Sequence, residues 1–447
     1  MTLLDLFPSL RSVAQPRLDA TVWPYETHYD AEGRITVAGV ALADLADRYG
    51  TPTYVLAESD VRASCRAYRE RFPDAEIIYA GKALLTRAVA RWVADEGLSV
   101  DVCSTGELAT ALAAGVDPGR IVLHGNGKTR EDLATAVDSG VGRIVVDSHA
   151  EITLLSAVVA RPQRVLLRLS PGIDVHGHPA VRTGVLDQKF GFPLGSGAAA
   201  EAIERILSRP ELRLTGLHCH LGSQIHDPDH YGEAIRRMVA EMAWVRHEHG
   251  HLMTELDIGG GHAVAYRGGD AQMNLYELAD IIEDALDAAC AEHRFPRPRI
   301  AMEPGRAIVA RAGVTVYRVL SVEHVEGGHT FVTVDGGMSD NPRVALYGAK
   351  YEVVVANRHT GGPKMTATVV GRHCEAGDVL ATDVRLPADL RPGEVLAVPC
   401  TGAYHHSQAS NYNGIGRPPI VAVRDGGSRE IIRRETIADL LGRDIAL

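Results

Sequence analysis

Ile77-Ile78-Tyr79-Ala80-Gly81-Lys82-Ala83 is the stretch around which this chain is organised. It predicts a short apolar β-strand that ends on a lysine. The chain has few lysines, and Lys82 alone directly follows such a strand. A desolvated lysine loses its proton easily and can attack a carbonyl to form a Schiff base. Taken alone, the segment is more typical of an ordinary surface lysine, so its interpretation depends on the motifs in the rest of the chain.

Length, charge and cysteine content narrow the class of protein. The chain has 447 residues, which exceeds one average domain and predicts two. An apolar fraction of 45% allows a sizeable core, and a net charge of -11 argues against a nucleic-acid partner. Six cysteines without a C-x-x-C pair form no disulfide framework. With no signal-peptide pattern at the start and no apolar run of membrane-spanning length, we expect a soluble cytoplasmic protein.

A regular alternation of strands and helices predicts the main domain. Eight β-branched or aliphatic runs predict strands at 76–82, 98–103, 120–124, 143–147, 164–169, 213–219, 255–258 and 299–303. Helical patterns lie between them, which implies parallel strands joined by crossover helices. Eight such units in about 230 residues predict an α/β fold of the (β/α)8 TIM-barrel type. A doubly wound sheet is the alternative, but no G-x-G-x-x-G follows the first strand.

The pattern changes after about residue 310. Runs at 314–322, 330–334, 351–355, 364–370, 394–398 and 419–424 predict strands separated by Gly, Pro and Asp. They indicate a mostly β C-terminal domain, a β-barrel or a sandwich. The predicted organisation is an N-terminal arm at 1–48 that joins the β domain, a barrel domain at 49–310, and a β domain at 311–447. A further strand at 53–57 precedes the eight barrel strands and falls within the segment 49–310.

The residues that follow the barrel strands carry the chemistry, because active sites of such barrels lie at the C-terminal strand ends. Polar residues and glycines collect there, in Lys82, Asp101-Val102-Cys103-Ser104, His124-Gly125-Asn126, the run from His218 to Gln224, Asp257-Ile258-Gly259-Gly260-Gly261 and Glu303-Pro304-Gly305-Arg306. We therefore expect the active site at this end of the barrel.

The run Gly259-Gly260-Gly261 is a candidate phosphate site. Glycines let backbone N–H groups approach an anion closely, and barrel phosphate sites commonly follow strands 7 and 8. Arg306 and the hydroxyl of Ser223 could donate to the same phosphate. Three glycines alone would be weak support, since they also fit a tight turn. Together with Lys82 they indicate a phosphorylated aldehyde, pyridoxal 5′-phosphate (PLP).

Glu303 and His220 fit the rest of that cofactor. A carboxylate at the pyridine nitrogen keeps it protonated, which makes the ring a strong electron sink. His220 has an aromatic face to stack on the ring, although a hydrogen-bonded barrel histidine is the ordinary alternative and His218 competes for the role. The H-x-H pair also suggests a metal, but no third ligand stands at a convincing spacing, so no metal is predicted.

A set of ordered motifs resembles a known family. The motifs are YAGKA, DVCSTGEL, HGNGK, GLHCHLGSQI, DIGGGH, EPGRAIVA, DGGMSDNPRVALYGA, HCEAGDVL and TGAY. Read in that order, they resemble diaminopimelate decarboxylase, a PLP enzyme family with an alanine-racemase-like barrel and a β domain. The resemblance runs from about residue 35 to about residue 425. Each motif is weak singly, whereas the ordered set is highly specific.

The resemblance implies the PLP-dependent decarboxylation of meso-2,6-diaminopimelate to L-lysine and CO2, a step in lysine biosynthesis. It implies that Lys82 holds PLP covalently, that His220 stacks on the ring and that Glu303 faces the ring nitrogen. The other cofactor residues that it implies are Ser223, Gly260, Gly261, Gly305, Arg306 and Tyr404.

The resemblance also implies how the substrate is held. The substrate residues are Arg306, Arg343, Tyr347, Glu375 and Tyr404. Arg343 and Tyr347 would bind the distal carboxylate, and Glu375 the distal amine. Cys374 would donate the proton that replaces CO2, and its ordinary alternative is a role in packing only. In this family the Cys-Glu pair reaches the barrel of the partner subunit, so a homodimer with shared active sites is implied.

Departures from the family pattern leave alternatives open. The tyrosine of TGAY is followed by His405-His406-Ser407-Gln408, where the family has small residues or a methionine-containing run, and Gly127 stands where asparagine is common. The first departure leaves open a related amino acid or an amino-acid conjugate of natural-product biosynthesis as the substrate. A racemase of the same fold would place an arginine at the pyridine nitrogen, so Glu303 argues against it. A non-catalytic PLP carrier would be a bare barrel, and the β domain argues against that.

Overall fold

The computed structural model describes residues 18–175, 184 and 189–445. Within them the chain divides into two compact units. The barrel unit comprises Arg62–Ala263 and Ala271–Ile308. The β unit comprises the described residues up to Val61, the segment Val264–Asp270 and the described residues from Val309 onward. Each unit has a sheet and a buried core of its own.

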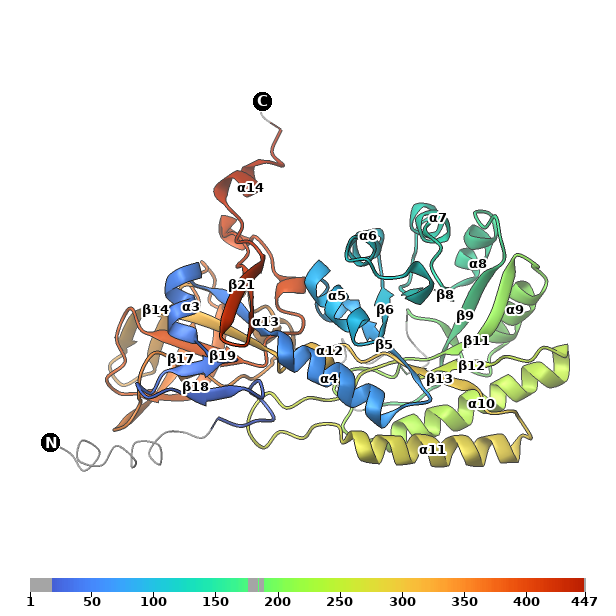
Figure 1. Cartoon of the computed structure of the whole chain (residues 1–447), viewed down its shortest axis with the longest axis horizontal. Helices are drawn as coiled ribbons and strands as arrows, with labels where there is room; N and C mark the ends of the chain where they lie inside the picture. Colours follow the sequence, from blue (N-terminus) through green and yellow to red (C-terminus); the bar gives the residue numbers. More distant parts are fainter. Residues whose placement is uncertain (1–17, 176–183, 185–188, 446–447) are drawn as a thin grey trace. The chain divides into compact units, whose positions relative to one another are not determined.

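The barrel unit contains a parallel sheet that closes on itself (Figure 1). Its strands, among the described residues, are β5 (Glu76–Ala80), β6 (Ser99–Val102), β7 (Ile121–Leu123), β8 (Arg143–Val146), β9 (Gln163–Ser170), β11 (Leu212–His218), β12 (Glu255–Asp257) and β13 (Arg299–Met302). They follow sequence order around the sheet, β13 pairs with β5, and a short strand β10 (Phe192–Pro193) extends the pairing of β9. The prediction of a (β/α)8 barrel is confirmed, since each predicted strand run is present and every pairing is parallel.

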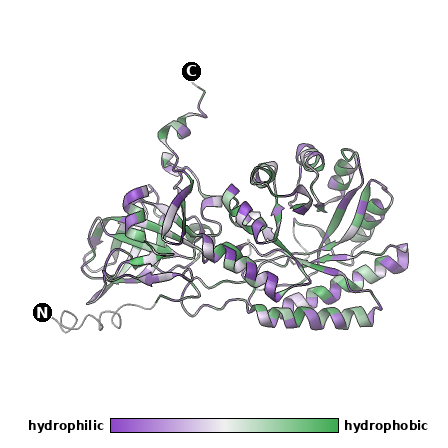
Figure 2. Cartoon of the chain, viewed as in Figure 1, coloured by the Kyte–Doolittle hydropathy of each residue, from purple (hydrophilic) through white to green (hydrophobic). Residues whose placement is uncertain are grey.

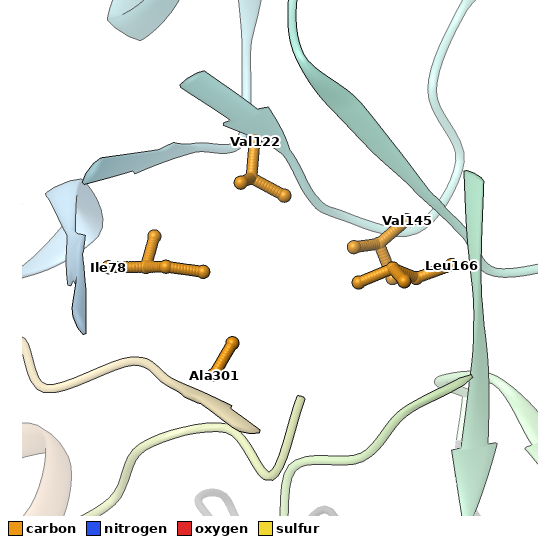
Figure 3. Close-up of a cluster of buried hydrophobic side chains, with 5 residues drawn as sticks. All are labelled: Ile78, Val122, Val145, Leu166 and Ala301. Atoms are coloured by element: carbon orange, nitrogen blue, oxygen red, sulfur yellow. The ribbon is translucent and has the colours of Figure 1, made fainter. Parts of the chain in front are cut away.

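The inside of the barrel is filled by side chains from five different strands (Figure 3). They are Ile78, Val122, Val145, Leu166 and Ala301, and none is more than 4% exposed. Full burial of one such valine, leucine or isoleucine side chain contributes roughly 1.5–3 kcal/mol. The strands are therefore held by a packed apolar interior, and the polar residues are left to the strand ends.

Helices follow the barrel strands where the sequence provides a cap. They are α5 (Arg87–Asp95), α6 (Thr105–Ala113), α7 (Arg130–Ser139), α8 (His149–Ser156), α9 (Gly197–Leu207), α10 (Asp229–His249) and α11 (Leu275–Glu292). Each of α5 to α9 begins after a Ser or Thr whose hydroxyl accepts a backbone N–H of the first turn, a contact worth about 1 kcal/mol. The long helices α10 and α11 lie side by side and carry both hydrophilic and hydrophobic residues (Figure 2). In the described part of the chain, no helix is both long enough and apolar enough to cross a membrane.

A cluster of charged side chains lies at the N-terminal ends of several barrel strands and is called the N-terminal charge cluster below. Arg143 of β8 donates to Glu76 of β5 at 2.5 and 2.8 Å and to Glu255 of β12 at 3.1 Å. Arg164 also pairs with Glu255, and Nη2 of Arg299 lies 2.9 Å from Glu76. The side chain of Arg143 is only 4% exposed, so its positive charge is buried, and these carboxylates offset the cost of removing that charge from water.

The β unit is built on a second sheet. Its strands are β4 (Thr53–Ala57), β14 (Gly313–His324), β15 (Thr330–Val334), β16 (Val354–Val355), β17 (Lys364–Val370), β18 (Val379–Pro387), β19 (Val395–Pro399), β20 (Ile420–Arg424) and β21 (Gly427–Ile432). The order is β18-β17-β15-β14-β4-β20-β21, and β19 pairs with β14 and β16. The β unit also contains a small antiparallel sheet and short helices: β1 (Thr27–Tyr29), β2 (Ile35–Val37), β3 (Val40–Ala41), α3 (Leu42–Tyr49), α13 (Arg343–Tyr347) and α14 (Ile437–Leu441). Two further helices, α4 (Glu58–Arg71) and α12 (Arg306–Val309), contain residues of both units and lie mostly in the barrel unit.

The structure differs from the sequence-based prediction in where one strand belongs. The sequence pattern places the strand at 53–57 in the barrel segment at 49–310, but this strand, β4, pairs with β14 and β20 in the sheet of the β unit. All five of its residues are buried, as a central strand of either sheet would be. An apolar run indicates a buried strand and does not indicate which sheet the strand joins.

Candidate active site

Lys82 lies directly after β5, in a single 3-10 turn, η1 (Gly81–Ala83). A Cβ at Gly81 would lie 2.6 Å from the carbonyl oxygen of Asp101, so only glycine lets the turn pack so close to β6. Nζ of Lys82 lies 3.9 Å from Oδ2 of Asp101. The lysine side chain is 41% exposed, whereas Asp101 is fully buried. The lysine side chain is therefore partly exposed, while its amine lies near a buried carboxylate.

His220 lies just after β11 and is oriented by the glycine loop. The backbone N–H of Gly260 donates to Nδ1 of His220 at 3.2 Å. Burial, and then the positive charge of Lys82, hold the pKa of His220 well below its usual value. The ring is therefore neutral at pH 7 and carries its proton on Nε2. It offers an aromatic face near Lys82 without adding a second cation.

Glu303 follows β13 and lies between two histidines. Its Oε1 is 2.6 Å from Nε2 of His124, and its Oε2 is 3.3 Å from Nε2 of His218. The three side chains are at most 5% exposed. Burial alone would raise the pKa of Glu303, but the two histidines outweigh it and hold this pKa well below the usual range. Glu303 is therefore a carboxylate, the form that can accept a hydrogen bond from a protonated ring nitrogen.

This carboxylate belongs to a cluster of four possible metal ligands. One ligand atom from each of His124, His218, Asp257 and Glu303 lies within 4.8 Å of the others. The four come from the ends of β7, β11, β12 and β13, so no spacing along the chain reveals them. The H-x-H pattern suggests a metal held by His218 and His220, whereas the structure pairs His218 with Glu303. The absence of a metal stays a prediction.

Gly259-Gly260-Gly261 forms a tight loop after β12. Gly259 and Gly261 have φ angles of 71° and 104°, which favour glycine. A Cβ at Gly260 would overlap the carbonyl oxygen of Glu303. The N–H groups of Gly259 and Gly260 already donate to Asp257 and His220. The glycines thus let this loop pack closely against the neighbouring backbone, and these two N–H groups bond within the protein itself.

Donors for an anion lie beside this loop. Nη2 of Arg306, the first residue of α12, donates to the hydroxyl oxygen of Ser223 at 2.9 Å, and Arg306 is 7% exposed. Gly305 lets α12 begin close to β5, because a Cβ there would lie 2.9 Å from Cβ of Ala80. The structure therefore brings Ser223 and Arg306 together in the barrel unit, as predicted for a phosphate site.

The predicted substrate residues of the β unit gather around a buried guanidinium. Cζ of Arg343 lies 5.2 Å from the ring centre of Tyr347 and 5.5 Å from that of Tyr404. Nε of Arg343 donates to the hydroxyl of Tyr351 at 3.0 Å. Tyr404 has a φ of 62°, a conformation that costs energy in a residue other than glycine and is common at functional sites. Arg343, Tyr347 and Tyr404 thus form one group within the β unit.

Cys374 and Glu375 lie in an exposed loop that a second loop holds in place. The backbone N–H of Cys374 donates to Oδ1 of Asn413 at 3.1 Å, and the hydroxyl of Tyr412 donates to Oε2 of Glu375 at 2.9 Å. The thiol is exposed. The loop is therefore held by one contact to its backbone and one to the Glu375 carboxylate, and both Cys374 and Glu375 remain exposed.

The unusual His405-His406 pair is packed into the β unit. His405 is fully buried, its Nδ1 lies 3.0 Å from the carbonyl oxygen of Ala403, and its ring meets that of Tyr351 edge-on at 5.3 Å. The ring of His406 meets that of Tyr54 at 5.8 Å. His405 therefore packs against Tyr351, whose hydroxyl accepts a hydrogen bond from Arg343.

Comparison with known proteins decides the family. Residues 58–310 match the family described as pyridoxal-dependent decarboxylase, pyridoxal binding domain. A diaminopimelate decarboxylase of Actinosynnema pretiosum subsp. auranticum is 54% identical over 445 residues, which cover 100% of both chains. The chain belongs to the diaminopimelate decarboxylase family.

Other diaminopimelate decarboxylases agree along the whole chain. The enzyme of Mycobacterium tuberculosis (strain ATCC 25618 / H37Rv) is 43% identical over 440 residues, which cover 96% of this chain and 98% of that one. A crystal structure of diaminopimelate decarboxylase from M. jannaschii in complex with L-lysine matches with a TM-score of 0.88 and 30% identity, over 95% of this chain and 98% of that chain. The resemblance seen in the motifs is confirmed, and the chain is a PLP-dependent carboxy-lyase.

The barrel unit of this diaminopimelate decarboxylase family member fits PLP on its own geometry. A partly exposed lysine, a neutral histidine ring and a buried carboxylate lie at the ends of β5, β11 and β13. A glycine loop in which a side chain would collide lies beside the Ser223–Arg306 pair. These are the groups that an aldehyde, an aromatic ring, its nitrogen and a phosphate require.

Several residues of the site have no role that the sequence alone predicts. His124 and Asp257 stand at strand ends, and the rule that strand ends meet at one barrel mouth could have joined them to Glu303. Tyr351, Tyr412 and Asn413 carry no such signal. Each acts through a neighbour in another loop, and no spacing predicts that contact.

Proposed function

We propose that this chain removes one carboxylate from meso-2,6-diaminopimelate and releases L-lysine and CO2. The observation that carries the proposal is the grouping of Lys82, a neutral His220 and an ionised Glu303 at one end of a barrel. Full-length similarity to diaminopimelate decarboxylases supports this substrate over other amino acids. In the net reaction a carbon–carboxylate bond breaks, and a proton takes the place of CO2 on the carbon.

The barrel unit would hold the cofactor. Lys82 would bind the aldehyde carbon of PLP, and the other residues of this unit proposed for its phosphate and ring are Ser223, Gly260, Gly261, Gly305 and Arg306. Tyr404, a residue of the β unit, is proposed as a further cofactor contact on the family resemblance. When bound there, PLP supplies an electron sink for the electron pair that CO2 leaves behind. The neutral ring of His220 would cover one face and exclude water, and Glu303 would hold a proton on the pyridine nitrogen.

The β unit would select the substrate by its far end. Meso-diaminopimelate carries a second carboxylate and a second ammonium group at its far end. Lysine and ornithine carry a second ammonium group but no second carboxylate. Arg343, with Tyr347, would bind the distal carboxylate, and Glu375 would bind the distal ammonium group. Arg306 and Tyr404 would also contact the substrate. A charge-assisted contact of the arginine is worth roughly 1.5–3 kcal/mol, enough to favour a substrate with that carboxylate about tenfold or more.

Cys374 would supply the proton that completes the reaction. Its thiol is exposed in the chain, and the contact of its backbone with Asn413 fixes where the thiol can reach. The proton would pass from Sγ to the carbon that lost CO2, and solvent would then return a proton to the thiolate. Glu375 follows Cys374 directly, so one loop would place both the proton donor and the group that holds the distal ammonium.

We also propose that the active unit is a homodimer in the cytoplasm, with Cys374 and Glu375 acting in the partner's site. The support is the family resemblance, together with six free cysteines, which suit a reducing compartment. No nucleic-acid or membrane partner is proposed, and the net charge of -11 suits a small-molecule enzyme.

Product analysis tests the proposed function. The holoenzyme is incubated separately with meso-diaminopimelate, L-lysine, L-ornithine and L-arginine, and the amino-acid products and CO2 are measured. L-lysine should form from meso-diaminopimelate in a one-to-one ratio with CO2, and the other three should stay unchanged. The variant Arg343→Met should lose the preference for meso-diaminopimelate while retaining bound PLP. Faster CO2 release from lysine or ornithine than from meso-diaminopimelate would contradict the proposal.

A further inference from the structure

His124 and His218 have no part in the reaction as proposed so far, yet both contact the carboxylate of Glu303. His124 follows β7 and His218 ends β11, so neither is a sequence neighbour of Glu303. Each histidine contacts a different carboxylate oxygen, at 2.6 and 3.3 Å. Their rings meet edge-on with centres 4.9 Å apart. A carboxylate held at both oxygens in this way cannot rotate freely.

We propose that His124 and His218 are positioning residues that keep Glu303 ionised and aim it at the pyridine nitrogen of the cofactor. The proposal rests on the proposed function, because the state of Glu303 matters to catalysis only if Glu303 faces that nitrogen.

The surroundings of Glu303 explain why it needs these partners. A carboxylate taken out of water loses several kcal/mol of hydration. The nearby Asp257 cannot compensate, because burial and the negative charge of Glu303 raise the pKa of Asp257 well above its usual value. The histidines are the groups that lower the pKa of Glu303 against its burial. Without them, we expect Glu303 to take up a proton and stop supporting a protonated ring nitrogen.

The protonation state of His218 suits the role of a neutral donor. Burial lowers the pKa of His218 to about 4, so the ring carries one proton at pH 7. Among the described residues its Nδ1 has no hydrogen-bond partner, whereas its Nε2 faces Glu303. The proton therefore belongs on Nε2, where it is donated to the carboxylate. His218 stabilises the negative charge without cancelling it.

The position of His124 is fixed by the chain around it. Its backbone N–H donates to the carbonyl oxygen of Val102 at 2.8 Å, which continues the pairing of β7 with β6. The carbonyl oxygen of the next residue, Gly125, accepts from Nζ of the buried Lys128 at 2.6 Å. Both sides of His124 are thus anchored, as expected of a residue that must hold another in place.

A metal ion is the rival occupant of this cluster, and the distances argue against it. Two ligands of one tetrahedral zinc ion, each about 2.0–2.1 Å from it, lie about 3.3 Å apart. Nε2 of His124 and Oε1 of Glu303 are only 2.6 Å apart, closer than two ligands of one zinc ion, although the two atoms are not aligned as a hydrogen bond. The geometry therefore points to direct pairing of the histidine with the carboxylate.

Infrared difference spectra of the protein without cofactor test the proposal directly. Spectra of the wild type minus Glu303→Gln should show the bands of an ionised carboxylate. Spectra of His124→Leu minus His124→Leu/Glu303→Gln should show instead the carbonyl band of a protonated carboxylic acid, which shifts in D2O. The conservative His124→Gln, which keeps an N–H donor, should restore the carboxylate bands. An ionised carboxylate in His124→Leu and also in the second variant, His218→Leu, would overturn the proposal.

Kinetics of the holoenzymes supply the second readout. We expect His124→Leu to lower kcat for meso-diaminopimelate about tenfold or more with little change in KM, and to have almost no further effect in the Glu303→Gln background. His251→Leu is the matched control, since Nε2 of His251 bonds to the carbonyl oxygen of Leu214 and not to the site. Equal losses in both backgrounds, or zinc bound one-to-one in the purified holoenzyme, would overturn the proposal. If the proposed function were at fault instead, Glu303→Gln would itself retain activity while the infrared result still held.

Discussion

The substitution Lys128→Met removes a buried cation from the loop after β7 and should destabilise the barrel unit. Nζ of Lys128 donates to the carbonyl oxygens of Gly125 and Val145 at 2.6 and 2.7 Å and to Oε1 of Glu151 at 2.5 Å. Both side chains of the ion pair are 2% exposed. Methionine fills similar space, so the principal change is the loss of charge. Glu151 would keep the backbone N–H of Asp147, at 3.0 Å, as a hydrogen-bond donor.

The size of the loss in stability follows from the response of Glu151 that costs the least free energy, which is protonation of its carboxylate. Protonating a carboxyl with an ordinary pKa near 4.3 costs about 1.4 kcal/mol for each pH unit above that value, hence about 3–4 kcal/mol at pH 7. A similar cost, about 3–5 kcal/mol, is typical when one partner of a buried ion pair is removed. At about 2–4 °C per kcal/mol for a unit of this size, the melting temperature should fall by about 6–16 °C. At pH 5 the loss should shrink to about 1 kcal/mol, because the proton is then easily supplied.

Thermal unfolding followed by circular dichroism at pH 7 and pH 5 measures both quantities. Two controls are matched to the variant. Lys364→Met removes an exposed lysine and should change nothing, and Lys128→Met/Glu151→Gln removes both charges and should recover much of the loss. A fall of less than about 2 °C at pH 7, or a loss that does not depend on pH, would refute the reasoning from buried charge.

Further predictions address the active site and pH. Lys82→Ala should abolish turnover and the visible absorbance of bound cofactor while the fold stays native, because only the covalent link is lost; retained colour and activity would remove Lys82 from the site. Glu303→Gln should still bind PLP but slow decarboxylation at least about tenfold, or about 1.4 kcal/mol, and a smaller loss would mean that Glu303 does not serve the ring nitrogen. Mixing Lys82→Ala with Cys374→Ala subunits should restore about a quarter of wild-type activity. About half of the dimers are then mixed, and each mixed dimer has one intact site of two. No recovery after verified subunit exchange would place both residues in the site of one chain. Burial lowers the pKa of His262 and His406 to about 4. The unfolded chain takes up these protons near pH 6.5 and the folded chain does not, so urea midpoints should be flat above pH 7 and fall from about pH 6.5 toward pH 4, and His262→Phe should flatten that slope.

The barrel could be predicted from the sequence because its strands are buried on both faces. Segments such as Ile121–Leu123 are continuous apolar runs, and Ser or Thr caps mark where the helices after them begin. Strands β18 and β21 were not predicted. They lie at the two edges of their sheet, and solvent-facing residues such as Arg385 and Glu430 break the apolar pattern.

Residues of the site could be predicted only where a single motif, by its residue types and its position after a strand, indicates a chemical role. Lys82 at a strand end and Gly259-Gly260-Gly261 after another point to a phosphorylated aldehyde without any contact being known. The pairing of Glu303 with His124 could not be read in this way, because those residues are 179 positions apart and meet only when the barrel closes. The exposure of Lys82 was also not foreseen, since an apolar strand before a residue does not tell which way its side chain leaves the turn.

The N-terminal charge cluster has a consequence for how the barrel assembles. The barrel strands are apolar on both faces, so a strand that slips by one residue along its neighbour still buries apolar side chains, and apolar burial alone discriminates weakly between the two alignments. Arg143 reaches Glu76 and Glu255 only when β5, β8 and β12 are in their native register relative to one another. A slipped strand would leave a charge desolvated and unpaired, at a cost of several kcal/mol. The cluster therefore favours the native strand register over shifted registers. It does so at the end of the barrel opposite to the one that carries the chemistry.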